Sequence, residues 1–297
     1  MNSSPQRHQD IWWSDIEGPG MKVSIRVRKV LHQEETPFQS LLIFESLDLG
    51  NVLVLDGALQ TTQKDEYFYH EQLIHPAIMV APDRGLDVLL IGGGDGGAAR
   101  EILKHPSIRN LHMVEIDERV VTMCREYFPE LWKDARGQDI MKDPRYSLTI
   151  GDGLEWVRNM KNTGQKVDIV YADVSDPTGP SLSIFGTEFY RNVQAVLQED
   201  GIFAFQAESP LGMGSVHEQI LTCARSVFGK VFRYTGPVPT YPGGMWSFGF
   251  CSSKNPLLTS PQSFAEVVDR YEALLERGIS LRFYDPWWHR HAFTDFV

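Results

Sequence analysis

The spacing of apolar positions changes near residue 81 of the chain. Between Lys22 and Leu59 the sequence runs as the short apolar and β-branched stretches VSIRVRKVL, SLLIFESL and NVLVLD, separated by turn signals at 34–37 and 49–51. Runs of this length between turns predict strands that pair with their neighbours. We therefore expect a small N-terminal antiparallel β domain over residues 1–80.

A second pattern follows it. The stretch DEYFYHEQLIHPAIMV, from Asp65, has the spacing of a helix and leads to Pro82. Beyond it, the apolar strands VLLIGGG, LHMVEID, YSLTIGDG, VDIVYADV and GIFAFQAES alternate with helical segments. This alternation predicts an α/β fold with a doubly wound, mainly parallel sheet over residues 81–297. We expect the aromatic last residues, 283–297, to pack back onto this domain.

Net charge and cysteine content limit the classes of molecule that the protein is expected to bind. The 297 residues carry a net charge of -11, from 39 acidic and 28 basic side chains, which repels nucleic acid and anionic membranes and attracts small cations. The cysteines Cys124, Cys223 and Cys251 match neither a disulfide framework nor a zinc site. Neither a signal-peptide h-region nor about 18 consecutive apolar residues occur. We expect a cytoplasmic protein with a cationic substrate, no nucleic-acid partner and no membrane anchor.

The segment VLLIGGGDGGAARE, residues 88–101, is typical of a strand that turns through glycines into a helix, where backbone N–H groups can approach a ligand. Glu115, 20 residues beyond Asp95, ends the next strand, where a carboxylate can bind both hydroxyls of a ribose. NAD and S-adenosylmethionine proteins share this arrangement, so it predicts a nucleoside and leaves the reaction open. A tight turn with close helix packing is the structural alternative.

Asp95 lies where dinucleotide enzymes hold a pyrophosphate and methyltransferases hold the amino-acid end of their cofactor. Two like charges about 4 Å apart repel by roughly 4 kcal/mol at an effective dielectric near 20. Asp95 therefore favours a nucleoside without a carboxylate, such as decarboxylated S-adenosylmethionine. A role in capping the following helix is an alternative that does not exclude the first. Asp152 and Gly153, in TIGDG, follow a third strand, where an adenine could be bound.

Two carboxylates follow the strand VDIVYAD. Asp173 and Asp176 lie in a loop stiffened by Pro177 and Pro180. A primary amine with a pKa near ~10 is mostly protonated at neutral pH and must lose a proton before it attacks a carbon. We expect Asp173 to accept that proton, Tyr69 to aim the nitrogen, and Asp176 to bind the rest of a diamine. A solvated loop with helix-capping aspartates is the alternative.

Two pairs of histidines are candidates for metal ligands. His70 and His75 are five residues apart, so on a helix they diverge by about 140° and do not match a zinc-protease helix. His289 and His291 lie among tryptophans and Phe293, where packing explains them better. We expect no metal, since displacement beside a sulfonium needs only alignment of two bound substrates.

Six motifs together resemble the spermidine synthase (polyamine aminopropyltransferase) family: GGGDGGAARE, VEID, GDG, DVSDPTGP, QAES and PTYPGG, in this order, within a similarity from about Leu41 to the C-terminus. The resemblance implies a small N-terminal β domain on a Rossmann-like catalytic domain of the S-adenosylmethionine-dependent methyltransferase type, assembled as a homodimer. It implies transfer of the aminopropyl group of decarboxylated S-adenosylmethionine to putrescine, without a separate cofactor. Val174 departs from the serine or threonine that is frequent between the two aspartates.

The resemblance also implies a role for each site residue. It implies that Asp173 is the proton acceptor, that the diamine contacts are Tyr69, Asp173, Asp176, Gln206 and Tyr241, and that the nucleoside contacts are Gln39, His70, Asp95, Glu115, Asp152 and Gly153. The alternatives are an aminopropyltransferase with a longer acceptor amine, an amine N-methyltransferase, a catalytically inactive paralogue and a NAD oxidoreductase.

Overall fold

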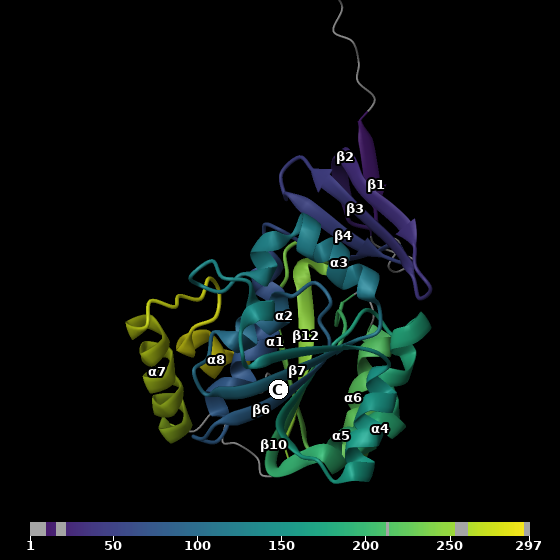
Figure 1. The fold of residues 1–297 in the computed structure, drawn as a ribbon. Helices are drawn as coiled ribbons and strands as arrows, with labels where there is room; N and C mark the ends of the chain where they lie inside the picture. Colours follow the sequence, from purple (N-terminus) through teal and green to yellow (C-terminus); the bar gives the residue numbers. More distant parts are fainter. Residues whose placement is uncertain (1–9, 16–21, 212–213, 253–260, 294–297) are drawn as a thin grey trace, which may run out of the picture.

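The computed structural model describes residues 10–15, 22–211, 214–252 and 261–293 and contains two sheets (Figure 1). The first nine residues, on which the expectation of no signal peptide partly rests, and the last four residues of the aromatic segment 283–297 lie outside these ranges. No helix in the described part of the chain combines the length and apolarity that crossing a bilayer requires.

The N-terminal sheet is antiparallel throughout, as predicted, and its strands pair in sequence order. They are β1 (Ile11–Ser14), β2 (Ser24–Glu35), β3 (Ser40–Ser46), β4 (Asn51–Leu55) and β5 (Ala58–Thr62). In the central pair, Leu41 lies opposite Leu55 and Ile43 opposite Leu53, and all four side chains are buried. These cross-strand apolar contacts fix the register of β3 on β4.

The second sheet has the order β11-β12-β10-β9-β6-β7-β8. Its strands are β6 (Leu86–Gly92), β7 (Ile108–Glu115), β8 (Tyr146–Ile150), β9 (Val167–Asp173), β10 (Leu197–Gln206), β11 (Val231–Pro237) and β12 (Met245–Ser252). The five strands from β10 to β8 are parallel, which confirms the predicted mainly parallel sheet. The antiparallel pair β12 and β11 extends one edge and was not among the predicted strands.

Helices cover both faces of this sheet (Figure 1). They are α1 (Glu66–Val80), α2 (Gly97–Leu103), α3 (Glu118–Tyr127), α4 (Gly153–Thr163), α5 (Thr187–Val196), α6 (Gly214–Phe228), α7 (Pro261–Glu276) and α8 (Pro286–Ala292). Val88 and Leu90 of β6 join the core under α1 to α3, whereas Leu89 and Ile91 join the core under α4 to α6. Alternate side chains therefore face opposite cores, as in a doubly wound fold.

Helix α1 bears on the predicted domain boundary near residue 81. It packs against α2, β10 and α7, so it belongs spatially to the second sheet, and the antiparallel sheet already ends at Thr62. Its interior contains Pro76, which lacks the N–H that would bind the carbonyl of Gln72. The hydroxyl of Tyr234, on β11, donates to that carbonyl instead, at 2.8 Å, and ties the helix to the sheet edge.

The C-terminal aromatic segment packs back onto the domain, as predicted for the residues that are described. Phe293 lies 4.7 Å from Tyr234, ring to ring, and Trp288 contacts the same ring edge-on. His289 is fully buried, and burial lowers its pKa to about 3. Its neutral ring shares a 2.6 Å hydrogen bond with Tyr284, so packing accounts for this histidine.

Candidate active site

A single cavity between the N-terminal sheet and the carboxyl ends of the parallel strands contains every residue predicted for the site. Those residues are Gln39, Tyr69, His70, Asp95, Glu115, Asp152, Gly153, Asp173, Asp176, Gln206 and Tyr241. Leu53, Leu55 and Leu59 of the N-terminal sheet form part of its apolar wall. The site therefore needs both sheets.

The cavity lies where the strand order reverses. From β6 the chain goes outward to β7 and β8 in one direction and to β9 and β10 in the other, so β6 and β9 flank the switch point at which ligands bind in open α/β sheets. Gly92 pairs with Asp173 across these two strands. Gly92 has a φ of +81°, and a Cβ there would lie 2.0 Å from the backbone oxygen of Asp173. Only glycine lets the loop turn this close to the proposed proton acceptor.

Asp173 ends β9 at the floor of the cavity. The hydroxyl of Tyr69, on α1, donates to its Oδ1 at 2.8 Å. Burial, opposed by the charge of His70, raises the pKa of Asp173 to about 6. A carboxylate with this pKa is mostly ionised at neutral pH and still a competent proton acceptor, which is the balance that general-base catalysis requires.

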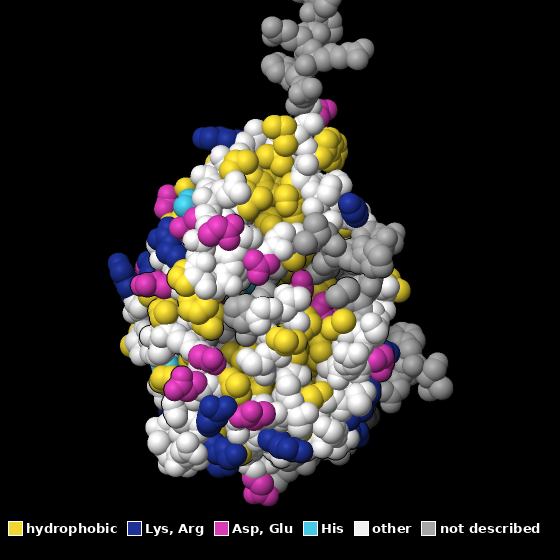
Figure 2. All heavy atoms as spheres, turned by 90° about the vertical axis from the view of Figure 1, so that its right-hand side faces the viewer, with side chains coloured by type: hydrophobic (Ala, Val, Ile, Leu, Met, Phe, Trp, Pro, Cys, Tyr) yellow, Lys and Arg dark blue, Asp and Glu magenta, His cyan; other side chains and the backbone are white. Residues whose placement is uncertain are grey.

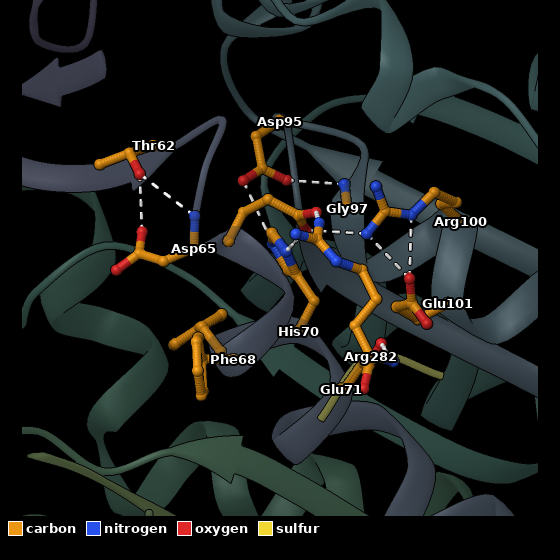
Figure 3. Close-up of polar contacts among 12 residues, drawn as sticks. Thr62, Asp65, Phe68, His70, Glu71, Asp95, Gly97, Arg100, Glu101 and Arg282 are labelled. Carbon is orange, nitrogen blue, oxygen red and sulfur yellow. Dashed lines mark hydrogen bonds and ion pairs between the residues drawn. The ribbon is translucent and has the colours of Figure 1, made fainter. Parts of the chain in front are cut away.

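Asp95 is held from two sides (Figure 3). The backbone N–H of Gly97 donates to Oδ1 at 2.8 Å, and His70 Nε2 lies 3.2 Å from Oδ2. The N-cap of α2 is Gly96, so Asp95 is not the capping residue, but its backbone contact engages the first N–H of that helix and coexists with the ion pair. A Cβ on Gly97 would lie 2.2 Å from the His70 ring, so this glycine makes room for the imidazole. The side chain of Asp95 keeps 15% exposure, towards the cavity.

The nucleoside end is built by side chains that fix one another. Glu115 accepts a hydrogen bond from the backbone N–H of Asp117 at 2.9 Å, and burial raises its pKa to about 7. Gln39, from the turn between β2 and β3, donates to Asp117 at 3.0 Å. Asp152 caps α4 by accepting from the backbone N–H groups of Leu154 and Glu155. These hydrogen bonds fix the side chains of Gln39, Glu115 and Asp152 where they line the cavity.

The acceptor end combines aromatic rings with acids. Tyr241 packs 6.0 Å from Tyr69, ring to ring, and its hydroxyl donates to the backbone of Gln60 in β5. Asp176 follows in the loop after β9 and lines the same cavity. Gln206 donates to the carbonyl of Val174 at 3.3 Å and so bridges two strand ends.

Glu208 is an acid that the sequence reasoning quoted within QAES without giving it a role. It is fully buried and adopts a φ of +67°, which is uncommon for a residue other than glycine. Burial and then the neighbouring Asp176 raise the pKa of Glu208 well above its ordinary value. A buried acid beside an aspartate is best relieved by a cation, so Glu208 belongs with the acceptor end. A glutamate two residues after a strand-end glutamine is the only signal the sequence offers.

Two groups of acidic and histidine side chains within the described ranges bring ligand-type atoms within 4.8 Å of one another. One, the cavity cluster, consists of His70, Asp95 and Asp173; the other, the inner cluster, consists of Glu71, His75 and Glu101. In the cavity cluster both ring nitrogens of His70 already face carboxylates of the protein, those of Glu66 and Asp95. In the inner cluster Glu71 accepts backbone N–H groups, Glu101 pairs with Lys104, and His75 lies between Glu101 and His105. Neither arrangement favours a metal ion.

The fold and the cavity define an α/β enzyme on the scaffold that S-adenosylmethionine-dependent methyltransferases use. Comparison with known proteins narrows the class. Residues 66–260 match the spermine/spermidine synthase domain, and residues 11–63 match the spermidine synthase tetramerisation domain. The two matches meet between 63 and 66, just ahead of α1.

Individual relatives agree. A polyamine aminopropyltransferase of Moorella thermoacetica is 40% identical over 285 residues, which are 96% of this chain and 93% of the relative. A crystal structure of spermidine synthase with the transition state analogue AdoDATO superposes with a TM-score of 0.85 at 31% identity, covering 99% and 94% of the two chains. The spermidine synthase of Thermotoga maritima gives a TM-score of 0.82 at 30% identity with the same coverage. The chain belongs to the spermine/spermidine synthase family and is an aminopropyltransferase.

Proposed function

We propose that the chain is a spermidine synthase, which transfers the aminopropyl group of decarboxylated S-adenosylmethionine to putrescine and forms spermidine and 5'-methylthioadenosine. The observation that carries this proposal is the pair of carboxylates in one cavity: Asp95 at the glycine loop and Asp173 at the end of β9. An anion at each place suits a cationic nucleoside and a cationic acceptor. The relatives' names support the same reaction class.

The proposed chemistry is a direct displacement. The nitrogen lone pair of putrescine attacks the carbon beside the sulfonium, the carbon–sulfur bond breaks, and its electron pair stays on sulfur. Asp173 accepts the proton that the nitrogen loses, and the hydroxyl of Tyr69, 2.8 Å from Asp173, orients the carboxylate. Alignment of the two substrates supplies the remaining acceleration, so the proposal includes no metal and no separate cofactor.

Putrescine is the proposed acceptor because the acids at the far end of the cavity fit a second ammonium. Asp176 lines the cavity and Glu208 lies buried beside it. Tyr241 contributes a rigid apolar wall between the two ends. An aminopropyltransferase with a longer acceptor, of the spermine synthase type, stays the alternative within the family.

The test is to incubate the protein with decarboxylated S-adenosylmethionine and, separately, with putrescine, longer diamines, spermidine and a monoamine. Mass spectrometry of the products is expected to give spermidine and 5'-methylthioadenosine with putrescine as the best acceptor. Preference for spermidine would select the longer-acceptor alternative. A methylated amine formed from S-adenosylmethionine would contradict the proposal in favour of an N-methyltransferase.

We propose further that copies of this chain assemble through the N-terminal sheet. Figure 2 shows hydrophobic side chains gathered over that end of the molecule, and Ile11, Trp12 and Val30 are more than half exposed there. The match of residues 11–63 to a tetramerisation domain supports self-association. Analytical ultracentrifugation would distinguish a homodimer, which the resemblance implies, from a tetramer.

We also propose that the protein resides in the cytoplasm, a proposal supported by its three free cysteines.

A further inference from the structure

His70 lies between two carboxylates from different parts of the chain (Figure 3). Its Nε2 is 3.2 Å from Asp95 and its Nδ1 is 2.8 Å from Glu66, one turn earlier on α1. A neutral imidazole carries one N–H and one lone pair, so in either tautomer it would turn a lone pair towards a carboxylate. Only the imidazolium donates to both partners.

Glu66 is itself fixed as a carboxylate. Its Oε2, which accepts from His70, also accepts from Nη2 of Arg100 at 2.8 Å, and the Glu66 side chain is 3% exposed. Burial favours the neutral acid, but the hydrogen bond from His70 and the charge of Arg100 outweigh it and lower the pKa of Glu66. A protonated Glu66 would leave the guanidinium of Arg100 facing a neutral oxygen in a buried site.

We infer that Glu66, held by Arg100, is a positioning residue that keeps His70 an imidazolium close to both Asp95 and Asp173. Neither Glu66 nor Arg100 lines the cavity. The inference deepens the proposed function, because the imidazolium supplies the countercharge for two partly buried carboxylates when the cationic substrates are absent. Without it, one of the two carboxylates would take up a proton, and the proton acceptor would be lost at neutral pH.

The groups that face this unit come from three elements, α1, α2 and β9, and from two loops. They are Glu66 and Tyr69 on α1, Asp95 in the glycine loop, Asp173 at the end of β9, Arg100 and Glu101 on α2, and Arg282 before α8. Arg282 lies 3.8 Å from the other oxygen of Glu66 and is 55% exposed, so it adds a weaker, screened charge. Burial alone would lower the pKa of His70, but Asp95 and Glu66 raise it well above its ordinary value.

The primary experiment needs no substrate. Long-range ¹H–¹⁵N spectra of histidine-labelled protein, with His70→Gln to assign the signal, are expected to show both nitrogens of His70 protonated at pH 7.5. In Glu66→Gln the ring is expected to titrate at lower pH, because an amide can donate to Nδ1 and stabilise the neutral ring. Glu71 is a buried carboxylate one residue beyond His70 that accepts the backbone N–H groups of 282–284, so Glu71→Gln is the matched control and should leave His70 unchanged.

A neutral His70 in the wild type at pH 7.5, or an unchanged titration in Glu66→Gln, overturns the inference whether or not the protein transfers an aminopropyl group. If Glu66→Gln does not fold, the wild-type spectrum alone decides.

The second readout is the pH dependence of kcat/KM for the acceptor. Glu66→Gln is expected to move the acid limb to higher pH, since Asp173 loses its countercharge. At pH 6.5 its efficiency should fall on the order of tenfold relative to wild type, and the gap should narrow towards pH 8.5. A loss that is equal at all pH values, or shared by Glu71→Gln, indicates a merely structural role and contradicts the inference.

Discussion

Two clusters of acids and histidines lie on different sides of α1, and they differ in how completely their acids are paired. Towards α2 and the segment before α8 lies the inner cluster, where Glu71 accepts three backbone hydrogen bonds from residues 282–284 and Glu101 pairs with Lys104 at 2.6 Å and with His75 at 3.0 Å. Towards the cavity lies the cavity cluster, where Asp173 accepts one side-chain hydrogen bond within the described ranges, from Tyr69. The number of hydrogen-bond and ion-pair partners of an acid, and not its residue type, thus distinguishes a structural acid from a reactive one.

The largest effect is expected when the cavity cluster loses its proton acceptor. Asp173→Asn removes the carboxylate but keeps its volume, so turnover should fall by about 10²–10⁴-fold while the nucleoside still binds. Single-turnover kinetics and calorimetry with the nucleoside measure the two properties separately. Turnover near the wild-type value would mean that Asp173 is no more reactive than an acid of the inner cluster.

A smaller effect is expected at the acceptor end. Asp176→Asn removes one charge-assisted contact, worth roughly 1.5–3 kcal/mol, and should lower putrescine efficiency by about ten- to a hundredfold. A monoamine of similar length should be a poor substrate that the substitution hardly changes. Tyr241→Ala should act in the same direction through lost packing. Unchanged ratios between the two amines in both variants would place the acceptor pocket elsewhere.

Asp95 tests whether the partly exposed acid of the cavity cluster discriminates between nucleosides. Decarboxylated S-adenosylmethionine is expected to bind at least about tenfold more tightly than the carboxylated form, because like charges repel. The imidazolium of His70 offsets part of that repulsion. Asp95→Asn should narrow the difference in calorimetric affinity. Equal affinities in the wild type would refute the discrimination.

The last effect is on stability, and its sign differs between the clusters. Because the pKa of Asp173 is raised from 3.8 to about 6, its stabilising contribution is complete below pH 3.8 and is lost as the pH rises through 6. Asp173→Asn should therefore increase the free energy of unfolding at pH 7.5 by about 1–3 kcal/mol relative to wild type. Glu71→Gln should decrease it by about 1–3 kcal/mol, because backbone donors lose their partner. Chemical denaturation at pH 7.5 measures the free energy of unfolding of both variants. A change of the same sign in the two variants would contradict the proposed difference between the clusters.

Much of this architecture follows from the sequence because its signals are local. A few consecutive residues are enough to predict the glycine turn, the strand ends at Glu115 and Asp173, and the alternation of strand with helix. The resemblance added Gln39 and Tyr241, which come from distant segments and which no local pattern links to the cavity.

What the sequence did not reveal depends on long-range pairing. The strands β11 and β12 are antiparallel additions that no strand–helix alternation predicts. Helix α1 lies next to the antiparallel strands in sequence but packs on the second sheet, a choice made by tertiary contacts such as that of Tyr234 with Gln72. The partnership of Glu66 with Arg100, 34 residues apart, arises only when α1 meets α2.

Gly97, which leaves space for the ring of His70, makes substitutions at the two positions interdependent. A methyl group at 97 would overlap an imidazole only 2.2 Å away, so Gly97→Ala is harmful as long as the ring is present. Once residue 70 is shortened, the same alanine has room, and its remaining penalty is small. The two positions are therefore non-additive: the effect of a substitution at Gly97, the first residue of α2, depends on the side chain that α1 presents at position 70.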